Sequence, residues 1–497
     1  MIDVTSVDNM RKSDKYTIEN KTDSLTLMYR AGMGIYKSVK WHGKILIACG
    51  TGNNAGDGYV VASLLKDSGN DVEILMTEER FSDDGKYYFD VCHSKNVPWS
   101  VYNSQNLREY DIILDCIFGT GFKGEPKGNA KALIDAINES GAYVVSADIN
   151  SGLNGQSGLG NTCVKSDLTV SIGTYKAGHY LGKAKDKIGS LVNIDIGIDL
   201  QEKPYKLLEK DDVRSFLGKR KNHSHKGTYG YISLIGGCTM YSGAVKLANL
   251  SATAMRSGAG VVRLCVPSDI VPSIAPYLLE STLYPLNSEN GSIKFLENEI
   301  QSAIKGSKAI AVGMGLGQGG DNEKILEYIL KSSEVPVVID ADGLNTLGKM
   351  DLSILSECKC KVVLTPHLKE MERLCGVSLA EITENPIHYA MELAKKTGAI
   401  ILLKGTATII TDGEMVYLSN TGCAGMATAG SGDVLSGIVC AMCAQYEDAL
   451  LATASSAFIN GLAGENAMRE FGNIAMIASD TAKNVGKAIY QIEKADI

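Results

Sequence analysis

The sequence predicts an α/β protein with two domains, each built on a mainly parallel sheet. Nearly all-apolar runs of four to seven residues recur without polar alternation, as in strands buried on both faces. Segments with apolar residues at helical spacing lie between them, such as 58–68 and 129–140. The charged stretch 201–226, poor in β-branched residues, interrupts this rhythm once and is interpreted as a linker and the entry to the second domain. Alternating strands and helices predict doubly wound sheets, and the interruption predicts domains over 1–210 and 211–497.

The apolar runs give the expected strands in chain order. In the first domain they are 44–49, 72–76, 111–116, 143–149, 167–172 and 191–196. In the second domain they are 229–235, 260–266, 309–312, 335–340, 361–364 and 399–403.

Composition narrows the class of protein. With 44% hydrophobic and 21% charged residues the chain resembles an average soluble globular protein. A net charge of −8 argues against a nucleic-acid partner, which usually meets a basic patch. The N-terminus lacks the apolar segment of a secretory signal, and no run of 18 apolar residues could cross a membrane. We therefore expect a cytoplasmic protein without membrane or nucleic-acid partners. We also expect a homo-oligomer.

The 12 cysteines are scattered along the chain, and four of them form close pairs, Cys358 with Cys360 and Cys440 with Cys443. Neither pair has the second cysteine or histidine pair that a zinc site requires. We expect buried, reduced thiols.

In the first domain, strand 44–49 runs into the glycine loop 50–58 and then a helix. Loop N–H groups and a helix N-terminus favour an anion. The loop also matches part of the dinucleotide fingerprint, with Glu73 about 20 residues further on. Asn53, Asn54 and Asp57 are foreign to that fingerprint and add polar groups to the loop.

Two further expected strands have an aspartate next to their last residue, Asp115 in one and Asp148 in the other, and Ser151 follows the second strand. Carboxyl ends of parallel strands share one edge, so Asn54, Asp115, Asp148 and Ser151 are expected to converge. Oxygen ligands of this kind suit a hard cation. The alternative is that both aspartates cap helices or turns.

In the second domain, a glycine-rich segment, 420–433, opens an apolar helix and ends on Asp433. Free N–H groups converge at such a helix start, where an aspartate would repel a phosphate but could act as the base in a phosphoryl transfer. The alternative is a helix cap. The chain has no Walker A sequence. His367 follows another expected strand and is interpreted as a ligand contact. For Lys404, phosphate binding and a solvated side chain remain equally open.

The segments GTGNNAGDG (50–58), DCIFGTGFKGEPKG (115–128) and VVSADINSGLNGQSG (144–158) resemble the NAD(P)H-hydrate epimerase domain, a Rossmann-like three-layer fold. The resemblance covers most of residues 10–200. It implies K⁺ ligands at Asn54, Asp115 and Ser151, and an acid/base at Asp148, which also contacts the substrate. The other substrate contacts that it implies are Asn53, Asn54, Ala55, Gly56, Asp57, Gly119, Thr120, Gly121, Phe122, Lys123, Gly124 and Glu125. Ala55 and Asn150 depart from the glycine and proline usual in that family.

The ordered segments HKGTYG (225–230), VIDADGLN (338–345), TPHLKEMERL (365–374), LLKGTATIITDG (402–413) and AGMATAGSGD (424–433) resemble the ribokinase-like ADP/ATP-dependent NAD(P)H-hydrate dehydratase domain. The resemblance covers residues 222–485, with Ala429 replacing a frequent glycine. It implies contacts to the hydrated nucleotide from Ala244, Gly315, Gly317, His367 and Asp433, with Asp433 as the base. It implies adenine-nucleotide contacts from Lys404, Gly405, Thr406, Ala407, Thr408 and Gly432.

Together the two resemblances imply a repair enzyme for hydrated NADH and NADPH. One domain would interconvert the R and S hydrates, and the other would dehydrate the S epimer with ADP or ATP and Mg²⁺, giving AMP or ADP and phosphate. Phosphorylation turns a poor leaving group, hydroxide, into a good one. Two other functions remain open: a ribokinase-like kinase for a vitamin precursor or sugar alcohol, and a first domain that only binds a ligand.

Overall fold

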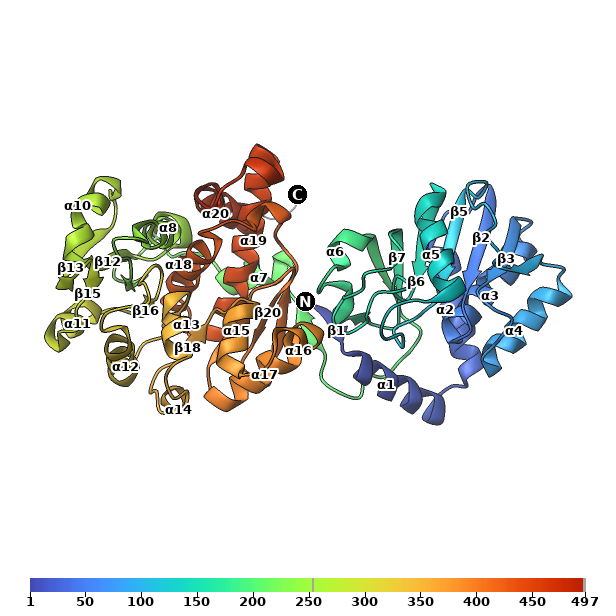
Figure 1. Ribbon diagram of the computed structural model, residues 1–497, viewed down its shortest axis with the longest axis horizontal. Coiled ribbons are helices and arrows are strands. Elements are labelled where there is room, and N and C mark those ends of the chain that lie inside the picture. Colours follow the sequence, from blue (N-terminus) through green and yellow to red (C-terminus); the bar gives the residue numbers. More distant parts are fainter. Residues whose placement is uncertain (253, 495–497) are drawn as a thin grey trace. The chain divides into compact units, whose positions relative to one another are not determined.

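The computed structural model describes residues 1–252 and 254–494, and these form two compact units (Figure 1). The N-unit comprises Asp3–Tyr205. The C-unit comprises Met1–Ile2 and the chain from Lys206 onward. The domain boundary expected after residue 210 therefore lies among the first residues of the C-unit.

The N-unit is built on a seven-stranded sheet in which every neighbouring pair is parallel. In spatial order its strands are β4 (Trp99–Val101), β3 (Asp71–Met76), β2 (Lys44–Cys49), β5 (Ile112–Cys116), β6 (Tyr143–Ala147), β7 (Ser166–Ile172) and β9 (Ile188–Ile194). The chain builds outward from β2 to β4 and then restarts on the other side of β2 with β5. This reversal is a topological switch point, where parallel α/β sheets bind their ligands.

Helices cover both faces of the N-unit sheet. The first face carries α2 (Ser24–Ser38), α3 (Asn53–Asp67) and α4 (Asp83–Ser94), and the second carries α5 (Gly128–Ser140). Smaller elements complete the unit: β1 (Ile2–Thr5), α1 (Val7–Asn20), β8 (Tyr175–Lys176), η1 (Ala177–His179) and α6 (Ala184–Lys187). Strands β1 and β8 pair in parallel. The three-layer arrangement is the one that the sequence predicts.

The C-unit has a longer sheet. In spatial order it contains β13 (Thr282–Leu286), β12 (Val261–Pro267), β11 (Tyr231–Ile235), β16 (Ala309–Val312), β17 (Val337–Ile339), β18 (Val362–Leu364), β19 (Ile400–Leu403), β20 (Thr408–Thr411), β21 (Val416–Ser419) and β10 (Tyr205–Leu207). The strands from β13 to β19 are parallel, whereas β20 is antiparallel to both of its neighbours. A small hairpin joins β14 (Ser288–Glu289) to β15 (Ser292–Ile293).

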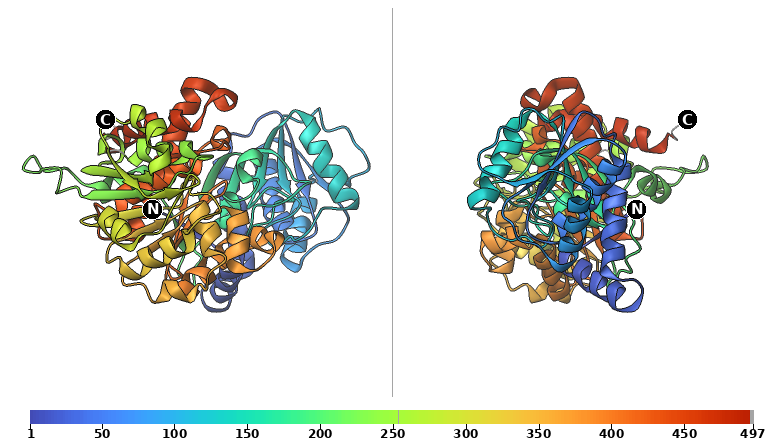
Figure 2. Two further views of the ribbon diagram at one scale, coloured as in Figure 1. Left: turned by 60° about the vertical axis from the view of Figure 1, so that its left-hand side comes forward. Right: turned by 90° about the vertical axis from the view of Figure 1, so that its right-hand side faces the viewer.

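Helices also cover both faces of this sheet (Figures 1 and 2). One face packs against α8 (Ser242–Ala252), α18 (Ser431–Cys443), α19 (Ala449–Ala475) and α20 (Ala478–Glu493), which share one hydrophobic core with the strands. The opposite face carries α12 (Asn322–Ser332), α13 (Asp342–Leu347), α15 (Leu368–Cys375) and α17 (Pro386–Thr397). The remaining helices are α7 (Lys210–Leu217), α9 (Ala254–Ser257), η2 (Ser268–Ile270), α10 (Val271–Ile274), η3 (Ala275–Tyr277), α11 (Glu297–Ile304), α14 (Ser353–Ser356), α16 (Leu379–Glu384) and η4 (Ala424–Met426).

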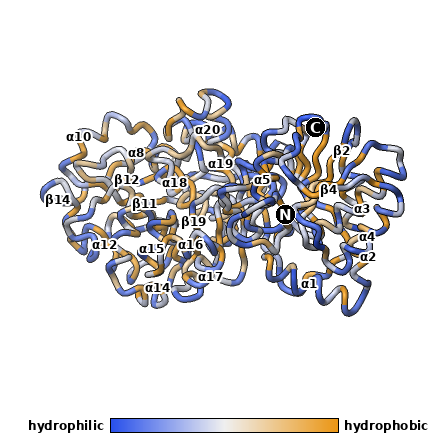
Figure 3. The backbone as a smooth tube through the Cα atoms, turned by 45° about the vertical axis from the view of Figure 1, so that its right-hand side comes forward, coloured by the Kyte–Doolittle hydropathy of each residue, from blue (hydrophilic) through white to orange (hydrophobic). Residues whose placement is uncertain are grey.

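The hydropathy pattern explains why the strands could be located from the sequence. Strands such as β2 are fully buried, and Figure 3 shows them as hydrophobic segments among hydrophilic loops. Every expected strand is confirmed, with ends shifted by up to three residues. The stretch 201–226, interpreted as a linker and the entry to the second domain, contains β10 and α7.

The cysteines are all free thiols. Cys440 and Cys443 are buried as expected, but Cys358 and Cys360 are partly exposed, because they lie in the loop before β18 rather than in an apolar element. Within residues 1–252 and 254–494, no helix is long and apolar enough to cross a membrane.

Candidate functional sites

The N-unit site lies at the switch point between β2 and β5. Helix α3 begins at Asn53, and no side chain caps its first turn. Gly50 follows β2 directly, and a Cβ there would collide with the carbonyl of Ile117 at the end of β5. The two loops therefore pass closer together than any side chain permits, which brings the asparagine loop against the end of β5.

Asn54 joins these loops. Its Nδ2 donates to Phe118 O at 3.0 Å and Ala147 O at 3.4 Å, so one amide spans the ends of two strands. Its Oδ1 is buried and has no hydrogen-bond partner in the described part of the chain. A buried carbonyl oxygen without a partner is costly, and it is an open ligand position for a cation.

Asp115 is the last residue but one of β5, and its side chain is fully buried. It accepts hydrogen bonds from Ser151 Oγ at 2.5 Å, Ser151 N at 2.9 Å and Ser146 Oγ at 2.8 Å. Burial nevertheless raises the pKa of Asp115 above its usual value, and no ion pair to it exists among the described residues. The expected convergence of Asp115 and Ser151 is thus present as direct contact.

Asp148 follows β6 with a φ of 62°, a left-handed conformation that is uncommon for a residue with a side chain. Its Oδ1 accepts from Lys176 Nζ at 2.5 Å, and its Oδ2 from Thr120 N at 3.3 Å. Burial acts to raise the pKa of Asp148, but the ammonium of Lys176 outweighs it and holds the pKa below its usual value. Asp148 is therefore an ionised carboxylate at neutral pH.

His179 supports this geometry from behind. Its Nε2 lies 2.8 Å from Asp148 O, and its Nδ1 accepts from Lys176 N at 3.1 Å. Burial and then the Lys176 charge lower the pKa of His179 to about 4, so the imidazole is neutral. An unprotonated Nδ1 leaves the proton on Nε2, which donates to the Asp148 carbonyl.

Of these residues, Asn54, Asp148 and Lys176 line a cavity of about 240 Å³. Of the predicted contacts, the cavity wall contains Asn53, Asn54, Asp57, Thr120 and Asp148. It also contains residues that the sequence patterns did not single out: Met10, Asp14, Ile18, Ser24, Leu27, Met28, Ala31, Asp84, Ile172, Lys176 and Ile196.

The predicted contacts at 121–125 lie outside the cavity wall. The Phe122 ring stacks on Phe118 with centroids 4.1 Å apart. Glu125 accepts from Asn161 Nδ2 at 2.9 Å and from Thr162 N at 3.2 Å. In this structure Phe122 packs within its own loop, and Glu125 ties that loop to the loop at Asn161 and Thr162.

Asn150 is fully buried and makes four side-chain hydrogen bonds. Its Nδ2 donates to Val164 O, Ser166 Oγ and Lys187 O, each at 3.0 Å, and its Oδ1 accepts from Thr169 Oγ1 at 2.6 Å. Where the resemblance implies a proline, this chain therefore has a polar crosslink beneath Ser151.

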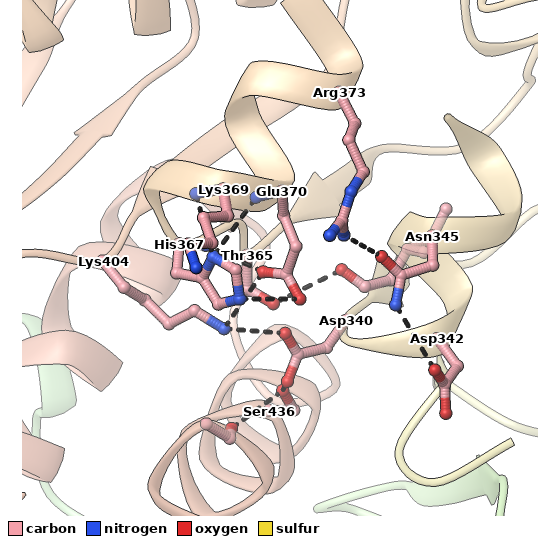
Figure 4. Close-up of polar contacts among 12 residues, drawn as sticks. Asp340, Asp342, Asn345, Thr365, His367, Lys369, Glu370, Arg373, Lys404 and Ser436 are labelled. Atoms are coloured by element: carbon pink, nitrogen blue, oxygen red, sulfur yellow. Dashed lines mark hydrogen bonds and ion pairs between the residues drawn. The ribbon is translucent and has the colours of Figure 1, made fainter. Parts of the chain in front are cut away.

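The C-unit site lies at the carboxyl ends of β16, β17, β18 and β19. Asp340 follows β17 and is buried. It accepts from Lys404 Nζ at 2.9 Å and from Ser436 Oγ at 2.6 Å (Figure 4). Burial acts to raise the pKa of Asp340, but the Lys404 charge holds it below its usual value. Lys404, whose role the sequence left open, is thus held in an ion pair.

Glu370 is the second buried carboxyl near Lys404, with 3.9 Å between Oε2 and Nζ. It also accepts from His367 N at 2.8 Å. His367 Nδ1 in turn accepts from the backbone N of Lys369 and Glu370 at 3.1 and 3.2 Å, so His367 caps helix α15 (Figure 4). Burial lowers the pKa of His367. Its imidazole is half exposed, and its Nε2 lies 3.5 Å from Glu370 Oε1.

Asp433 lies in the first turn of α18, after Gly430 with a φ of 92°. Burial, reinforced by the nearby Asp340, raises the pKa of Asp433 to about 7, against the opposing effect of Lys404. A Cβ on Gly432 would lie 3.2 Å from Lys404 Nζ. The structure therefore brings Lys404, Gly432 and Asp433 together, as the sequence predicts.

The glycine-rich end of β16 reaches the same region. A Cβ on Gly315 would lie 2.9 Å from Ala244 Cβ, which places these two predicted contacts side by side. Gly317 N donates to Asp342 Oδ2 at 2.8 Å. Gly313 has a φ of 124°, and a Cβ there would collide with Asp340 O. Residues 405–407 form the turn between β19 and β20, where Thr408 begins the second strand.

The motifs missed Asp14 and Lys176 in the N-unit and the Asp340–Glu370 pair in the C-unit. Asp340 and Glu370 follow strands in segments noted for their position, so a search for acidic residues at strand ends would have found them. Asp14 and Lys176 follow no such rule. Among the described residues, no three His, Cys, Asp or Glu side chains gather as a metal site.

The comparisons with known proteins cover both units. A family model described as NAD(P)H-hydrate dehydratase matches residues 232–487, and one described as YjeF-related protein N-terminus matches residues 24–178. A bifunctional NAD(P)H-hydrate repair enzyme of Archaeoglobus fulgidus is 34% identical over 468 residues, 94% of each chain. One of Moorella thermoacetica is 33% identical over 484 residues, 92% of this chain and 91% of its own.

Among solved structures, the ADP/ATP-dependent NAD(P)H-hydrate dehydratase of Bacillus subtilis, crystallised with ATP and Mg²⁺, is 29% identical. The match covers 58% of this chain and 99% of that one, with a TM-score of 0.52. It confirms the ribokinase-like fold expected for the second domain. The relatives span nearly the whole chain and both units. The chain therefore belongs to the family of bifunctional NAD(P)H-hydrate repair enzymes.

Proposed function

We propose that this chain repairs hydrated NADH and NADPH, with the C-unit dehydrating the S hydrate and the N-unit interconverting the R and S hydrates. The observation that carries the proposal is the Asp433 carboxyl, which is half-buried at the N-terminus of α18 beside Lys404. Burial and Asp340 raise its pKa to about 7, which suits a general base at neutral pH.

In the C-unit, Asp433 takes the proton from the hydroxyl of the hydrated nicotinamide ring as that oxygen attacks the terminal phosphoryl group of ADP or ATP. Free N–H groups at the start of α18 stabilise the developing negative charge. The phosphorylated hydroxyl then leaves as phosphate, and the ring double bond is restored. Ala244, Gly315, Gly317 and His367 contact the hydrate in this proposal.

The adenine nucleotide would bind along the turn after β19, through Lys404, Gly405, Thr406, Ala407 and Thr408, and at Gly432. Lys404 lies within reach of the α18 N-terminus while paired with Asp340, so its charge is already at the site. Mg²⁺ would be carried by the nucleotide phosphates, where it neutralises charge during phosphoryl transfer.

In the N-unit, Asp148 is the proposed acid/base and Asn53, Asn54, Ala55, Gly56 and Asp57 bind the hydrate, with Gly119–Glu125 as the facing loop. The Asp148 carboxylate opens into the cavity, and Lys176 and Thr120 fix its orientation. This support is strongest for the residues that line the cavity. Glu125 and Phe122 would reach the substrate only if their loop rearranged.

A K⁺ ion fits Asn54, Asp115 and Ser151. Asn54 Oδ1 is a buried acceptor without a partner, and Asp115 is a buried carboxyl without a counter-charge among the described residues. Oxygen ligands of this kind are those that hard cations use. When bound, the ion would supply positive charge beneath the loops that hold the hydrate. We also propose that the protein is cytoplasmic and forms a homo-oligomer. Light scattering of the purified chain would test the oligomeric state.

Recovery of NADH tests the whole proposal. A mixture of R and S NADH hydrates is incubated with the protein and ADP, ATP or no nucleotide, each with Mg²⁺, and absorbance at 340 nm is followed. Full recovery with one donor is expected and identifies that donor. Recovery of about half would leave the N-unit as a binding module. A stable phosphorylated product without NADH would favour a ribokinase-like kinase instead.

A further inference from the structure

The N-unit cavity contains acidic side chains besides Asp148, and one of them, Asp14, comes from an element that none of the site motifs includes. Asp14 projects from α1 into the cavity opposite the loop that carries Asp148. Asp148 is engaged by Lys176 and Thr120. Asp14 has no hydrogen bond or ion pair within the part of the chain that the structure describes. Its carboxyl is therefore free to bind a ligand or to exchange a proton.

The surroundings of Asp14 set it apart from Asp148 chemically. Burial, reinforced by the charge of Asp148, raises the pKa of Asp14 to about 6, against the effect of Lys176. Lys176 holds the pKa of Asp148 below its usual value. When the environments of two neighbouring carboxyls separate their pKa values, the one with the lower pKa serves as base and the one with the higher pKa as acid.

We propose that Asp14 is a catalytic residue of the epimerase site, the proton donor that works together with the Asp148 carboxylate. The proposal rests on the proposed epimerase function of the N-unit. It is carried by the geometry of one cavity in which Asp148 is held by an ammonium and Asp14, from a different element, has no partner among the described residues.

The chemistry balances with these two groups. The Asp148 carboxylate removes the proton from the hydroxyl on the ring carbon, the C–N bond between that carbon and the ring nitrogen breaks, and a C=O bond forms. Asp14 protonates the nitrogen that receives the electron pair. Rotation about the adjacent C–C bond presents the other face of the aldehyde. The nitrogen then attacks the aldehyde carbon, Asp14 takes back the N–H proton, and Asp148 returns its proton to the oxygen. This gives the other epimer with no oxidant or co-reactant.

The charge of the cavity supports this placement of the ring. Four carboxyls line it, from Asp14, Asp57, Asp84 and Asp148, against one ammonium, from Lys176. Such a wall disfavours a diphosphate and accepts the uncharged hydrated ring. Asp57 is a weaker candidate for the donor, because burial raises its pKa well above the usual value and it would give up its proton less readily.

The pH dependence follows from the charged groups that face Asp14, namely Asp57, Asp84, Asp148 and Lys176. A proton donor must be protonated in the free enzyme. Epimerase kcat/KM should therefore fall as pH rises through the pKa of Asp14, about 6. Asp148 stays ionised across this range because its pKa lies below the usual value.

Asp14→Asn in the full chain tests the proposal, with Asp8→Asn as the matched control. Asp8 lies on the same helix, but its side chain is 82% exposed. Purified R hydrate is incubated without nucleotide, and the S hydrate is measured by chromatographic separation against an enzyme-free blank at each pH from 5 to 9. Dehydration of S hydrate by the same preparations verifies that each variant is folded.

We expect Asp14→Asn to lower epimerase kcat/KM by roughly 10²–10⁴, the usual contribution of a general acid. The remaining activity of Asp14→Asn should no longer fall above pH 6. Asp14→Glu should restore part of the epimerase activity, and Asp8→Asn should match the wild type. An Asp14→Asn variant within threefold of the wild type, or with the same pH profile, would overturn the role of Asp14. Wild-type protein without epimerase activity would instead remove the proposed function of the N-unit, and the inference with it.

Discussion

Lys404 and Asp340 form a buried ion pair at the carboxyl ends of β19 and β17, with 2.9 Å between Nζ and Oδ1. The Asp340 side chain is 2% exposed and that of Lys404 22%. Because Ser436 donates to the other oxygen of Asp340, the pair also fixes the first turns of α18, which carry Asp433. One ion pair thus couples the proposed nucleotide-binding lysine to the position of the proposed base.

Replacing Lys404 by Met would leave Asp340 buried without a counter-charge. We expect a loss of about 3–5 kcal/mol in the free energy of unfolding of the C-unit, the range for breaking one side of a buried pair. The loss should shrink at low pH, where Asp340 can bind a proton. Hydrogen exchange of β17 and α18 would measure it. Lys395→Met is the control, since the Lys395–Glu392 pair is exposed and worth at most about 1 kcal/mol. Equal effects of both changes would contradict the coupling.

Asp433→Asn should abolish dehydration of the S hydrate and leave conversion of the R hydrate intact. The amide matches the carboxylate in shape but removes no proton, so a loss of roughly 10²–10⁴ in kcat is expected. Assays of each epimer separately would measure both activities. Loss of epimerisation as well would indicate misfolding or coupling between the units.

The rate of dehydration should increase with pH, as expected for a reaction that needs a general base. Asp433 acts only when ionised, so kcat/KM for the S hydrate should rise with pH through about 7 and then level off. Initial rates at 340 nm from pH 5.5 to 9 would show it. In Lys404→Met the midpoint should move upward, because Lys404 lowers the Asp433 pKa. A flat profile across this range would exclude Asp433 as the base.

Asn150→Ala should destabilise the N-unit by about 2–4 kcal/mol, because it leaves the buried carbonyls of Val164 and Lys187 without donors. The chain's two tryptophans, Trp41 and Trp99, both belong to the N-unit, so their fluorescence during urea unfolding reports on this unit alone. Asn20→Ala removes one exposed hydrogen bond, Nδ2 to Tyr16 O, and should change stability by under about 0.5 kcal/mol. A similar midpoint for both variants would contradict the structural role of Asn150.

K⁺ should stabilise the N-unit, because it would compensate the buried Asp115 carboxyl. We expect the midpoint of tryptophan-monitored thermal unfolding to rise with K⁺ relative to tetramethylammonium at equal ionic strength. Asn54→Leu should remove the K⁺-dependent part of the rise. A K⁺ response unchanged in Asn54→Leu would place the ion elsewhere.

Much of both sites follows from one topological rule. Since strands in a parallel sheet share a carboxyl edge, apolar runs ending on Asp115 and Asp148 were enough to predict their convergence with Asn54 and Ser151. In the second domain the glycine-rich helix start singled out Asp433, and its proximity to Lys404 comes from the structure. The end of an apolar run can be recognised in the sequence itself, so the residues at the carboxyl edge of the sheet could be predicted without the structure.

The missed residues depend on tertiary packing. Asp14 lies in a helix that also buries the polar residues Asn9, Ser13 and Thr17, so no local pattern marks the turn of α1 that faces the cavity. Lys176 is buried in β8, which pairs with β1, a strand about 170 residues earlier in the chain. Likewise, the exposure of His367 and its capping of α15 arise from the loop conformation rather than from its place after a strand.

The steric collision at Gly50 has a counterpart in the C-unit. Gly313 leaves β16 against the Asp340 carbonyl, as Gly50 leaves β2 against the Ile117 carbonyl. In each sheet two neighbouring strands part with no room for a methyl group between them. A deep mutational scan would therefore score both glycines as intolerant as Asp433 or Asp148. Their intolerance would report on backbone clearance, and only assays normalised to the amount of folded protein would separate it from chemistry.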